Sequence, residues 1–486
     1  MPHTFLDKID LASERVGGSV LYATDDYFAE KENLLKPSRA VWKEHEYTDR
    51  GKWMDGWESR RKRVEGHDFA IIRLGMRGVV RGIVADTAFF RGNYPESCAL
   101  EGTVAPAFAS VEELLNAHWT EILPRSPLQG DSENFFDIES RFAFTHLRLH
   151  IFPDGGVARL RVHGDPIPDW HPIGGLGETI DLAAAENGAE VLTCSDMFFG
   201  PKHNLIMPGR ALNMSDGWET KRRRGPGHDW VIVQLAAEGD VTRIEIDTNH
   251  FKGNYPDTCS IEASLDRENW TELLPRTKLQ AHTRHFFRDE LAHVGPTRFL
   301  RLNVFPDGGV SRLRVWGTAS EHARREAVVK RLDTLVPAAL ARELMACCAS
   351  TRWAARVADA APFGSWDALL ESADRIWSQL DPEDWQEAFA AHPRIGERKP
   401  VSRWSSEEQS GTNDAANETM HELAVANQQY EEKFGHVFLI CATGRNADEI
   451  LANCLVRMQN DADTELRNAA EEQRKITHLR LMKLVM

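Results

Sequence analysis

The sequence is poor in cysteine, in basic charge and in long apolar runs. Its 486 residues include seven Cys, an odd number without the C-x-x-C spacing of zinc sites, so neither a disulfide framework nor structural zinc is indicated. No segment approaches the ~18 consecutive apolar residues of a membrane span. The 58 Lys and Arg are outnumbered by 74 Asp and Glu, whereas phosphate binding needs a concentrated basic field. We therefore expect neither membrane insertion nor a nucleic-acid partner.

The first residues and the cysteines also bear on the compartment. Residues 1–16 carry acids where an export signal has a basic stretch followed by an apolar run. Unpaired cysteines suit a reducing environment. A cytoplasmic location is therefore expected.

Two long segments of the chain repeat each other. Asp55–Cys98 aligns without gaps to Asp216–Cys259, with 22 of 44 positions identical. Leu147–Gly164 matches Leu300–Gly317 at 14 of 18 positions. The first two thirds of the chain therefore hold two copies of one domain.

Short alternating patterns within each copy predict strands. Apolar residues alternate with polar ones at 243–247, and clusters of Gly, Pro, Asn and Asp separate such runs. The sequence PDGG at Pro153–Gly156, and again in the second copy, predicts a tight turn between two strands. We expect two all-β jelly-roll sandwiches, at residues 1–170 and 171–320.

The pattern changes from about Glu321 to long stretches with a period of 3.6, rich in Ala, Leu, Arg and Glu. We expect an all-α helical domain at residues 326–486. The predicted fold class is thus multidomain, with two jelly rolls followed by a helical domain.

Several duplicated polar residues of the β copies are candidates for chemistry. A charged set, Asp216, Glu219 and Arg222, surrounds Trp218. Asp247 ends an alternating strand, and Asn254 and Tyr255 lie in a GNYP loop. Each also has a structural interpretation, as an ion pair or a turn residue. The second copy has His250 where the first has Phe89, which favours a single site in the second copy. Its added histidines could ligate a metal, although their spacing fits no standard motif; these are His203, His250 and His285.

The motifs GWE, DT-x-x-F-x-GNYP and PDGG-x-x-RLRV-x-G occur twice in the same order, and on them residues 15–317 resemble allantoicase. The resemblance implies jelly rolls and hydrolysis of allantoate to ureidoglycolate and urea. This reaction needs a proton donor for the departing urea, a group that activates water, and a cation for the carboxylate. The candidates for proton transfer are Glu219, Asp247 and His250, and those for substrate binding are Arg222, Arg314, Asn254 and Tyr255. A divalent metal for this half stays an open question.

A second group of motifs lies in the helical region. Pro393 keeps His392 extended and presents it from a loop, and Ser405 reads as the N-cap of a helix that aims Glu408 and Gln409 at a cleft. The alternative for His392 is a structural role, and for Arg480, on the closing helix, a surface ion pair.

With HPRIGE at 392–397 and FLICATGRNADEIL from Phe438, residues 330–486 are similar to OHCU decarboxylase, the 2-oxo-4-hydroxy-4-carboxy-5-ureidoimidazoline decarboxylase. The resemblance implies His392 as catalytic acid/base with Glu408, and no cofactor, because an imine of the substrate can accept the electrons left by CO2. His436 stands where an apolar residue is usual. The substrate-binding residues implied are Pro393, Ser405, Gln409, Phe438, Ile440, Ala442 and Arg480.

The sequence therefore predicts a bifunctional enzyme of purine and ureide catabolism that acts on two small molecules. The alternative is that only the helical decarboxylase is active and that the β pair is a ligand-binding or scaffolding module. A homo-oligomer is possible, because a small polar substrate is often enclosed at an interface.

Overall fold

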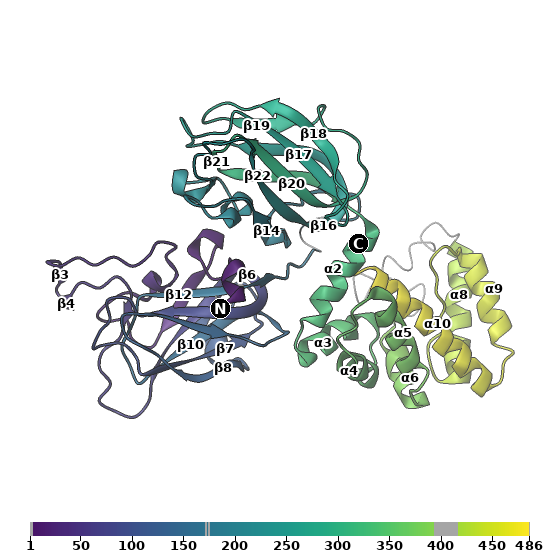
Figure 1. Ribbon diagram of the computed structural model, residues 1–486. Coiled ribbons are helices and arrows are strands. Elements are labelled where there is room, and N and C mark those ends of the chain that lie inside the picture. Colours follow the sequence, from purple (N-terminus) through teal and green to yellow (C-terminus); the bar gives the residue numbers. More distant parts are fainter. Residues whose placement is uncertain (1–2, 171–172, 174, 393–416, 486) are drawn as a thin grey trace. The chain divides into compact units, whose positions relative to one another are not determined.

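The computed structural model describes the chain except residues 1–2, 171–172, 174, 393–416 and 486. The chain divides into two compact units, Met1–Ala327 and Val328–Met486. The first unit contains two β-rich domains and the second is helical (Figure 1).

The first β domain is built on one long strand. β6 (Asp68–Asp86) pairs with the strands on both sides of it, and every pairing is antiparallel. The sheet order is β1-β12-β6-β10-β7-β8, and β2 and β9 also pair with β6. The other elements are β1 (Ile9–Asp10), β2 (Ser19–Ala23), β3 (Tyr47–Thr48), β4 (Gly51–Lys52), β5 (Trp57–Glu58), β7 (Ser97–Thr103), α1 (Val111–Leu115), β8 (Thr120–Pro127), β9 (Glu133–Asp137), β10 (Ala143–Phe152), β11 (Gly156–Val157) and β12 (Arg159–Pro166).

The second β domain repeats this order as β13-β22-β16-β20-β17-β18, with β14 and β19 pairing with β16 (Asp229–Asp247). Buried and half-buried residues alternate along the first half of β16 because successive side chains point to opposite faces of a sheet. Its other strands are β13 (Thr179–Asp181), β14 (Glu190–Cys194), β15 (Trp218–Glu219), β17 (Thr258–Ser264), β18 (Thr271–Lys278), β19 (Arg284–Phe287), β20 (Thr297–Phe305), β21 (Gly309–Val310) and β22 (Arg312–Ala319).

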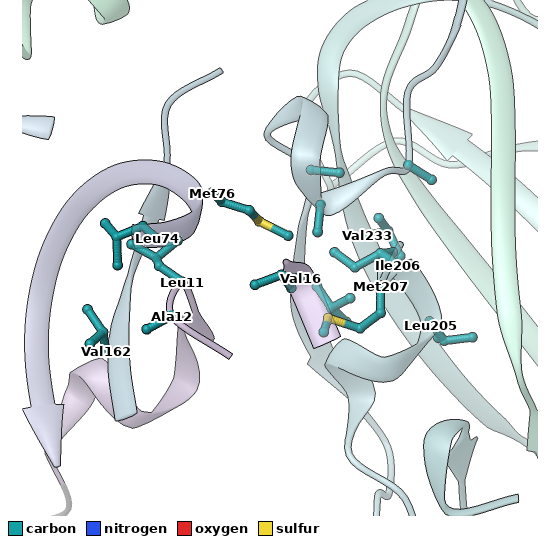
Figure 2. Close-up of a cluster of buried hydrophobic side chains, with 14 of the residues drawn as sticks. Leu11, Ala12, Val16, Leu74, Met76, Val162, Leu205, Ile206, Met207 and Val233 are labelled. Carbon is teal, nitrogen blue, oxygen red and sulfur yellow. The ribbon is translucent and has the colours of Figure 1, made fainter. Parts of the chain in front are cut away.

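The two β domains share one apolar core cluster. Figure 2 draws Val16 of the first domain together with Ile206 and Met207 of the second, all members of that cluster. Polar contacts also cross between the domains: Lys8 Nζ donates to Glu190 at 2.6 Å. The repeats thus pack on each other within one unit.

The helical unit has its own apolar core, and helix α2 contributes residues both to this core and to the core of the β domains. α2 (Glu321–Asp333) spans the change of unit, since Ala323 belongs to the β core and Val328 to the helical core. No helix among the described residues is long and apolar enough to cross a membrane. The further helices are α3 (Pro337–Cys347), α4 (Thr351–Asp359), α5 (Trp366–Trp377), α6 (Pro382–Ala390), α8 (Asn417–Phe434), α9 (Ala447–Arg457) and α10 (Ala462–Met482).

Gly309 packs tightly against the ring of Phe251 in the second β domain, so a larger side chain at this position should destabilise the fold. A Cβ atom on Gly309 would lie 2.0 Å from Cε1 of the fully buried Phe251, whereas one on Gly253, in the neighbouring loop, would meet nothing within 4 Å. We expect Gly309→Ala to lower the free energy of unfolding by about 1–3 kcal/mol and Gly253→Ala to change it by less than about 0.5 kcal/mol. Denaturant titration of both variants measures this, and equal stability would contradict the packing.

Candidate active sites

Glu219 is held at the end of the second β domain by backbone pairing on both sides. β15 pairs with β21, placing Glu219 opposite Gly309, and a bridge joins Glu219 to Gly200. The side chain is 8% exposed, and Asn254 Nδ2 donates a hydrogen bond to its Oε1. Burial raises the pKa of Glu219, and the bond from Asn254 opposes this shift. A carboxyl in this setting keeps its proton to higher pH than usual and suits a proton donor.

The PDGG turn places the loop that carries Asn254. Gly308 has a φ of +133°, and a Cβ there would lie 2.7 Å from the carbonyl oxygen of Asn254. Gly309 N–H donates to the same oxygen at 2.8 Å. Glycine is needed at this close approach. Tyr255, the next residue of the loop, is half-buried.

Asp247 and His250 lie on the same loop connection but make other contacts. Asp247 is buried at the end of β16, and its Oδ1 accepts the N–H of Asn249 at 2.8 Å. His250 has a φ of 70°, and its Nε2 lies 3.0 Å from the carbonyl oxygen of Ala211. Among the described residues, no hydrogen bond joins either side chain to Glu219.

The two arginines predicted to bind the carboxylate lie in different settings. Arg222 is exposed. Arg314 is half-buried on β22, where its Nη2 donates to the carbonyl oxygens of Met207, at 2.5 Å, and Gly209, at 2.7 Å. The structure therefore does not bring either guanidinium into a hydrogen bond with the Glu219–Asn254 pair.

The first β domain contains the same carboxyl–amide pair. Asn93 Nδ2 donates to Glu58 Oε1 at 2.7 Å, and burial raises the pKa of Glu58. A single site in the second copy, as expected from the sequence, leaves this pair in the first copy unexplained. The sequence does indicate this pair, because the motifs GWE and GNYP, which supply its glutamate and asparagine, occur in both copies.

The three histidines predicted as possible metal ligands make separate contacts, although His250 N–H donates to Nδ1 of His282, a fourth histidine of the second copy, at 2.8 Å. His285 makes two backbone contacts, from Nδ1 to the Ile246 oxygen at 3.1 Å and from Nε2 to the Gln280 nitrogen at 2.8 Å. Asn134 makes the matching contacts in the first copy. His203 is half-buried, with Nε2 4.0 Å from Asp7. Across the part of the chain that the structure describes, no cluster of three metal-ligating side chains occurs.

A cavity of about 390 Å³ lies on another face of the second β domain. Its polar groups bind one another: Asn303 Nδ2 donates to Glu262 at 2.8 Å, and Arg301 Nε donates to the same carboxylate at 2.6 Å. The lining residues are His228, Trp230, Ser260, Glu262, Glu272, Arg301, Asn303 and Phe305. None of them was a candidate for chemistry, and none belongs to the Glu219 loops.

In the helical unit His392 follows the end of α6. It is half-buried, and its N–H donates to the Phe389 oxygen at 3.0 Å. The next predicted site residues, Pro393, Ser405, Glu408 and Gln409, lie outside the described residues.

The segment from Phe438 to Ala442 runs between α8 and α9 without helix or strand. Phe438 and Ile440 are buried and Ala442 is half-buried. The segment is fixed by its backbone, since Cys441 N–H donates to Glu472 at 2.7 Å and the Leu439 oxygen accepts from Arg457 at 2.7 Å.

Arg480 belongs to a buried polar row on α10. Gln473, Thr477 and Arg480 are all buried, and Gln473 Nε2 donates to Thr477 Oγ1 at 3.2 Å. Residues three and four apart share one face of a helix. Gln473 and Thr477 were not predicted, although this spacing on a helix could have indicated them.

His436 fills an apolar position. Its ring centroid lies 5.2 Å from that of Phe389 and 5.6 Å from that of Tyr430. Burial lowers the pKa of His436. The neutral imidazole thus packs as an aromatic side chain beside the residue whose carbonyl binds His392.

Comparison with known proteins agrees with this division of the chain. The family model for the allantoicase repeat matches residues 9–167 and 180–320, and the model for OHCU decarboxylase matches residues 333–482. A probable allantoicase of Pseudomonas fluorescens (strain Pf0-1) is 51% identical over 324 residues, covering 64% of this chain and 97% of that protein. One from Photobacterium profundum is 47% identical over 328 residues, covering 65% and 98%.

Solved structures are also similar. The crystal structure of allantoicase from Saccharomyces cerevisiae is 34% identical, covers 64% of this chain and 92% of its own, and has a TM-score of 0.55. A structure of OHCU decarboxylase in the presence of (S)-allantoin is 39% identical, covers 29% and 96%, and has a TM-score of 0.27. The chain is thus an enzyme in two parts, a β-rich tandem repeat and a helical domain. It belongs to the allantoicase family, and its C-terminal part is an OHCU decarboxylase domain.

The packing of His436 predicts how stability depends on pH. Because the pKa of the folded imidazole is lowered, the stability that its neutral form contributes is present above the unfolded pKa of about 6.5 and is lost as pH falls below it. We expect His436→Phe to reduce the loss of unfolding free energy between pH 7.5 and 5.5. The exposed His421 on α8 supplies the control His421→Gln, with no such effect. A His436→Phe variant with the wild-type pH dependence would reject this account.

Proposed function

We infer that the chain is bifunctional. Its β repeats hydrolyse allantoate to ureidoglycolate and urea, and its helical domain decarboxylates OHCU to S-allantoin. The observation that carries the hydrolytic half is the buried Glu219–Asn254 pair within allantoicase repeats. The decarboxylase half is carried by the match over residues 333–482, which includes His392 and Arg480.

Allantoate hydrolysis breaks a bond between carbon and a ureido nitrogen, and that nitrogen must gain a proton as urea leaves. The raised pKa of Glu219 favours the protonated carboxyl that can supply this proton. The amide of Asn254 fixes the orientation of the carboxyl. The oxygen of water then bonds to the same carbon and gives up a proton, for which Asp247 and His250 are candidates. Arg222, Arg314 and Tyr255 remain candidates for holding the substrate.

We expect Glu219→Gln to lower the rate of urea release by about 10²–10⁴-fold, because it removes the proton donor, and to leave decarboxylation unchanged. The matched variant is Glu58→Gln, which changes the same pair in the first repeat. Urea release from allantoate by the purified chain, with and without EDTA, measures both effects.

The two variants show which repeat holds the hydrolytic site, and the chelator shows whether a divalent metal takes part. Loss of activity in Glu58→Gln alone would move the hydrolytic site to the first repeat. Loss of wild-type release on chelation would add a divalent metal to the site. No release by the wild-type chain under either condition would reject the hydrolytic function.

Decarboxylation of OHCU leaves two electrons on a ring carbon, and the adjacent imine can accept them. We therefore propose that this half needs no cofactor. An imidazole titrates near neutral pH, so His392 can accept the hydroxyl proton and return a proton to one face of the ring, which fixes the S configuration. The proposed contacts to the substrate are Glu408, Gln409, Ser405, Pro393, the segment Phe438–Ala442 and Arg480.

His392→Ala should abolish S-allantoin formation while urea release from allantoate persists. The readout is circular dichroism of the product formed from freshly generated OHCU. The control is His478→Ala, because His478 of α10 pairs through Nε2 with Asp374 of α5 at 2.7 Å. Normal S-allantoin formation by His392→Ala would exclude the role.

We also propose the jelly-roll fold of each β domain, the domain boundaries and the cellular location. The antiparallel pairing, the non-consecutive strand order and the 19-residue strands β6 and β16 support a jelly roll in each β domain. The boundaries 1–170 and 171–320 follow from the repeat, and 326–486 follows from the change to a helical period. All seven cysteines are free, which supports a cytoplasmic location.

A further inference from the structure

The irregular segment between α8 and α9 is fixed by side chains of two neighbouring helices. Arg457, the last residue of α9, donates through Nη1 to the carbonyl oxygen of Leu439 at 2.7 Å. Glu472 of α10 accepts the N–H of Cys441 at 2.7 Å. These two bonds reach the peptide groups that come directly before and directly after Ile440. The backbone on both sides of this residue is therefore set by α9 and α10.

Each of these bonds also directs the other polar group of its peptide. In a trans peptide the carbonyl and the N–H point to opposite sides, and both peptide bonds of Ile440 are trans. The Ile440 N–H therefore points away from Arg457, and the Ile440 carbonyl points away from Glu472.

The backbone polar groups of Ile440 have no partner among the described residues. Neither its N–H nor its carbonyl oxygen forms a hydrogen bond with them, although only 5% of the residue is exposed. Buried peptide groups are nearly always paired, so these two groups indicate a bound molecule. A donor and an acceptor on one residue are complementary to the N–H and C=O groups of a ureide, which OHCU and allantoin both contain.

Arg457 is itself held by a buried carboxylate. Glu465 is fully buried, and its Oε1 accepts from Arg457 Nε at 2.8 Å and from the Tyr430 hydroxyl. Its Oε2 accepts from Asn460 Nδ2 at 2.7 Å. Burial acts to raise the pKa of Glu465, but the hydrogen bonds that it accepts outweigh burial and lower the pKa. The guanidinium also lies over the ring of Phe438, with Cζ 4.9 Å from the centroid. Arg457 is thus a donor with a fixed direction.

We propose that Arg457 and Glu472 are positioning residues for decarboxylation, which fix the peptide groups on both sides of Ile440 and so present its N–H and carbonyl oxygen to the substrate. This inference rests on the function proposed for the helical domain. Both side chains act through the backbone, and neither transfers a proton. Groups that are fixed before binding lose no freedom when the substrate binds. A contact that is equal in substrate and transition state lowers KM and leaves kcat unchanged.

The first test is the steady-state kinetics of the full chain with freshly generated OHCU. Glu472→Ala removes the acceptor of the Cys441 N–H, and we expect KM to rise roughly 3–10-fold, the effect of one misplaced hydrogen bond, with kcat unchanged. Glu472→Gln keeps an oxygen that can accept this N–H and should retain the wild-type KM. The matched control is Lys475→Ala, because the exposed Lys475 binds the other oxygen of Glu472 at 2.6 Å. It removes the ion pair without altering the peptide contact.

The second variant is Arg457→Lys. A single ammonium group lacks the fork that reaches the Leu439 oxygen and Glu465 together, so we expect KM to rise here too. The retained charge keeps the buried Glu465 compensated and the domain folded. Arg467→Lys, at an exposed position of α10, is the control.

Binding of (S)-allantoin, measured by calorimetry, reports the same contact without catalysis. We expect the Kd of Glu472→Ala and of Arg457→Lys to rise by the same factor as KM, and the Kd of the two control variants to equal that of the wild-type chain.

The possible results are distinct. Wild-type KM and Kd in both Glu472→Ala and Arg457→Lys would overturn the proposal and leave the decarboxylase function intact. A fall in kcat alone would also overturn it, as would equal losses in Glu472→Ala and Lys475→Ala.

A wild-type chain that does not decarboxylate OHCU would instead reject the proposed function. In that case, weaker (S)-allantoin binding by Glu472→Ala would retain the positioning role, whereas unchanged or absent binding would overturn both.

Discussion

One buried arginine in each β repeat holds in place the short strand that carries the glutamate of the Glu–Asn pair. Arg312 donates through Nη1 to the carbonyl oxygens of Asn204, at 3.0 Å, and Asp216, at 2.6 Å, and through Nη2 to the Asp216 carboxylate at 3.1 Å. These bonds tie β22 to the segment that leads directly into Trp218 and Glu219. Arg159 makes the equivalent bonds to Asp55 in the first repeat. Burial lowers the pKa of Arg312 to about 10, so the guanidinium stays charged at neutral pH. Removing one member of such a buried pair leaves an uncompensated charge.

The second repeat adds a further charge to this arrangement. Arg15, from the first repeat, forms an ion pair with Asp216 and donates to Asn204 Oδ1 at 3.0 Å. Burial and the neighbouring Arg312 lower the pKa of Arg15 to about 10. The loop before Glu219 is thereby fixed by both repeats. The Asp55 carboxylate before Glu58 instead accepts from Arg159 at 2.8 Å and from the N–H of Val41 at 3.0 Å, both of the first repeat. Two copies of one sequence thus reached different surroundings for the same Glu–Asn pair.

The sequence predicted those features that depend on the spacing of apolar residues along the chain, namely which regions form strands and which form helices. Two β-rich domains followed by a helical region were predicted from alternation, from repeated motifs and from a change of period, and the structure confirms this division. Side-chain partners were harder to predict. The sequence placed Asp216 and Arg222 in one charged set, but Asp216 pairs with Arg312, 96 residues later, and with Arg15 of the other repeat. Only the strand register β16–β22 and the packing of the repeats bring these residues together. The Glu219–Asn254 contact likewise depends on β15 pairing with β21.

The proton-transfer groups proposed for the two halves lie in different surroundings. Burial raises the pKa of Glu219, so a carboxyl that is normally ionised at neutral pH approaches the range in which it can donate a proton to a departing ureido nitrogen. For the helical half the proposed group is His392, and the ordinary pKa of a histidine side chain lies near neutral pH. In the same half, burial lowers the pKa of another histidine, His436. Burial therefore shifts the pKa values of these two side chains in opposite directions. It extends the protonated state of an acid at the β site, and it removes the charge from an imidazole that packs as an apolar wall beside Phe389.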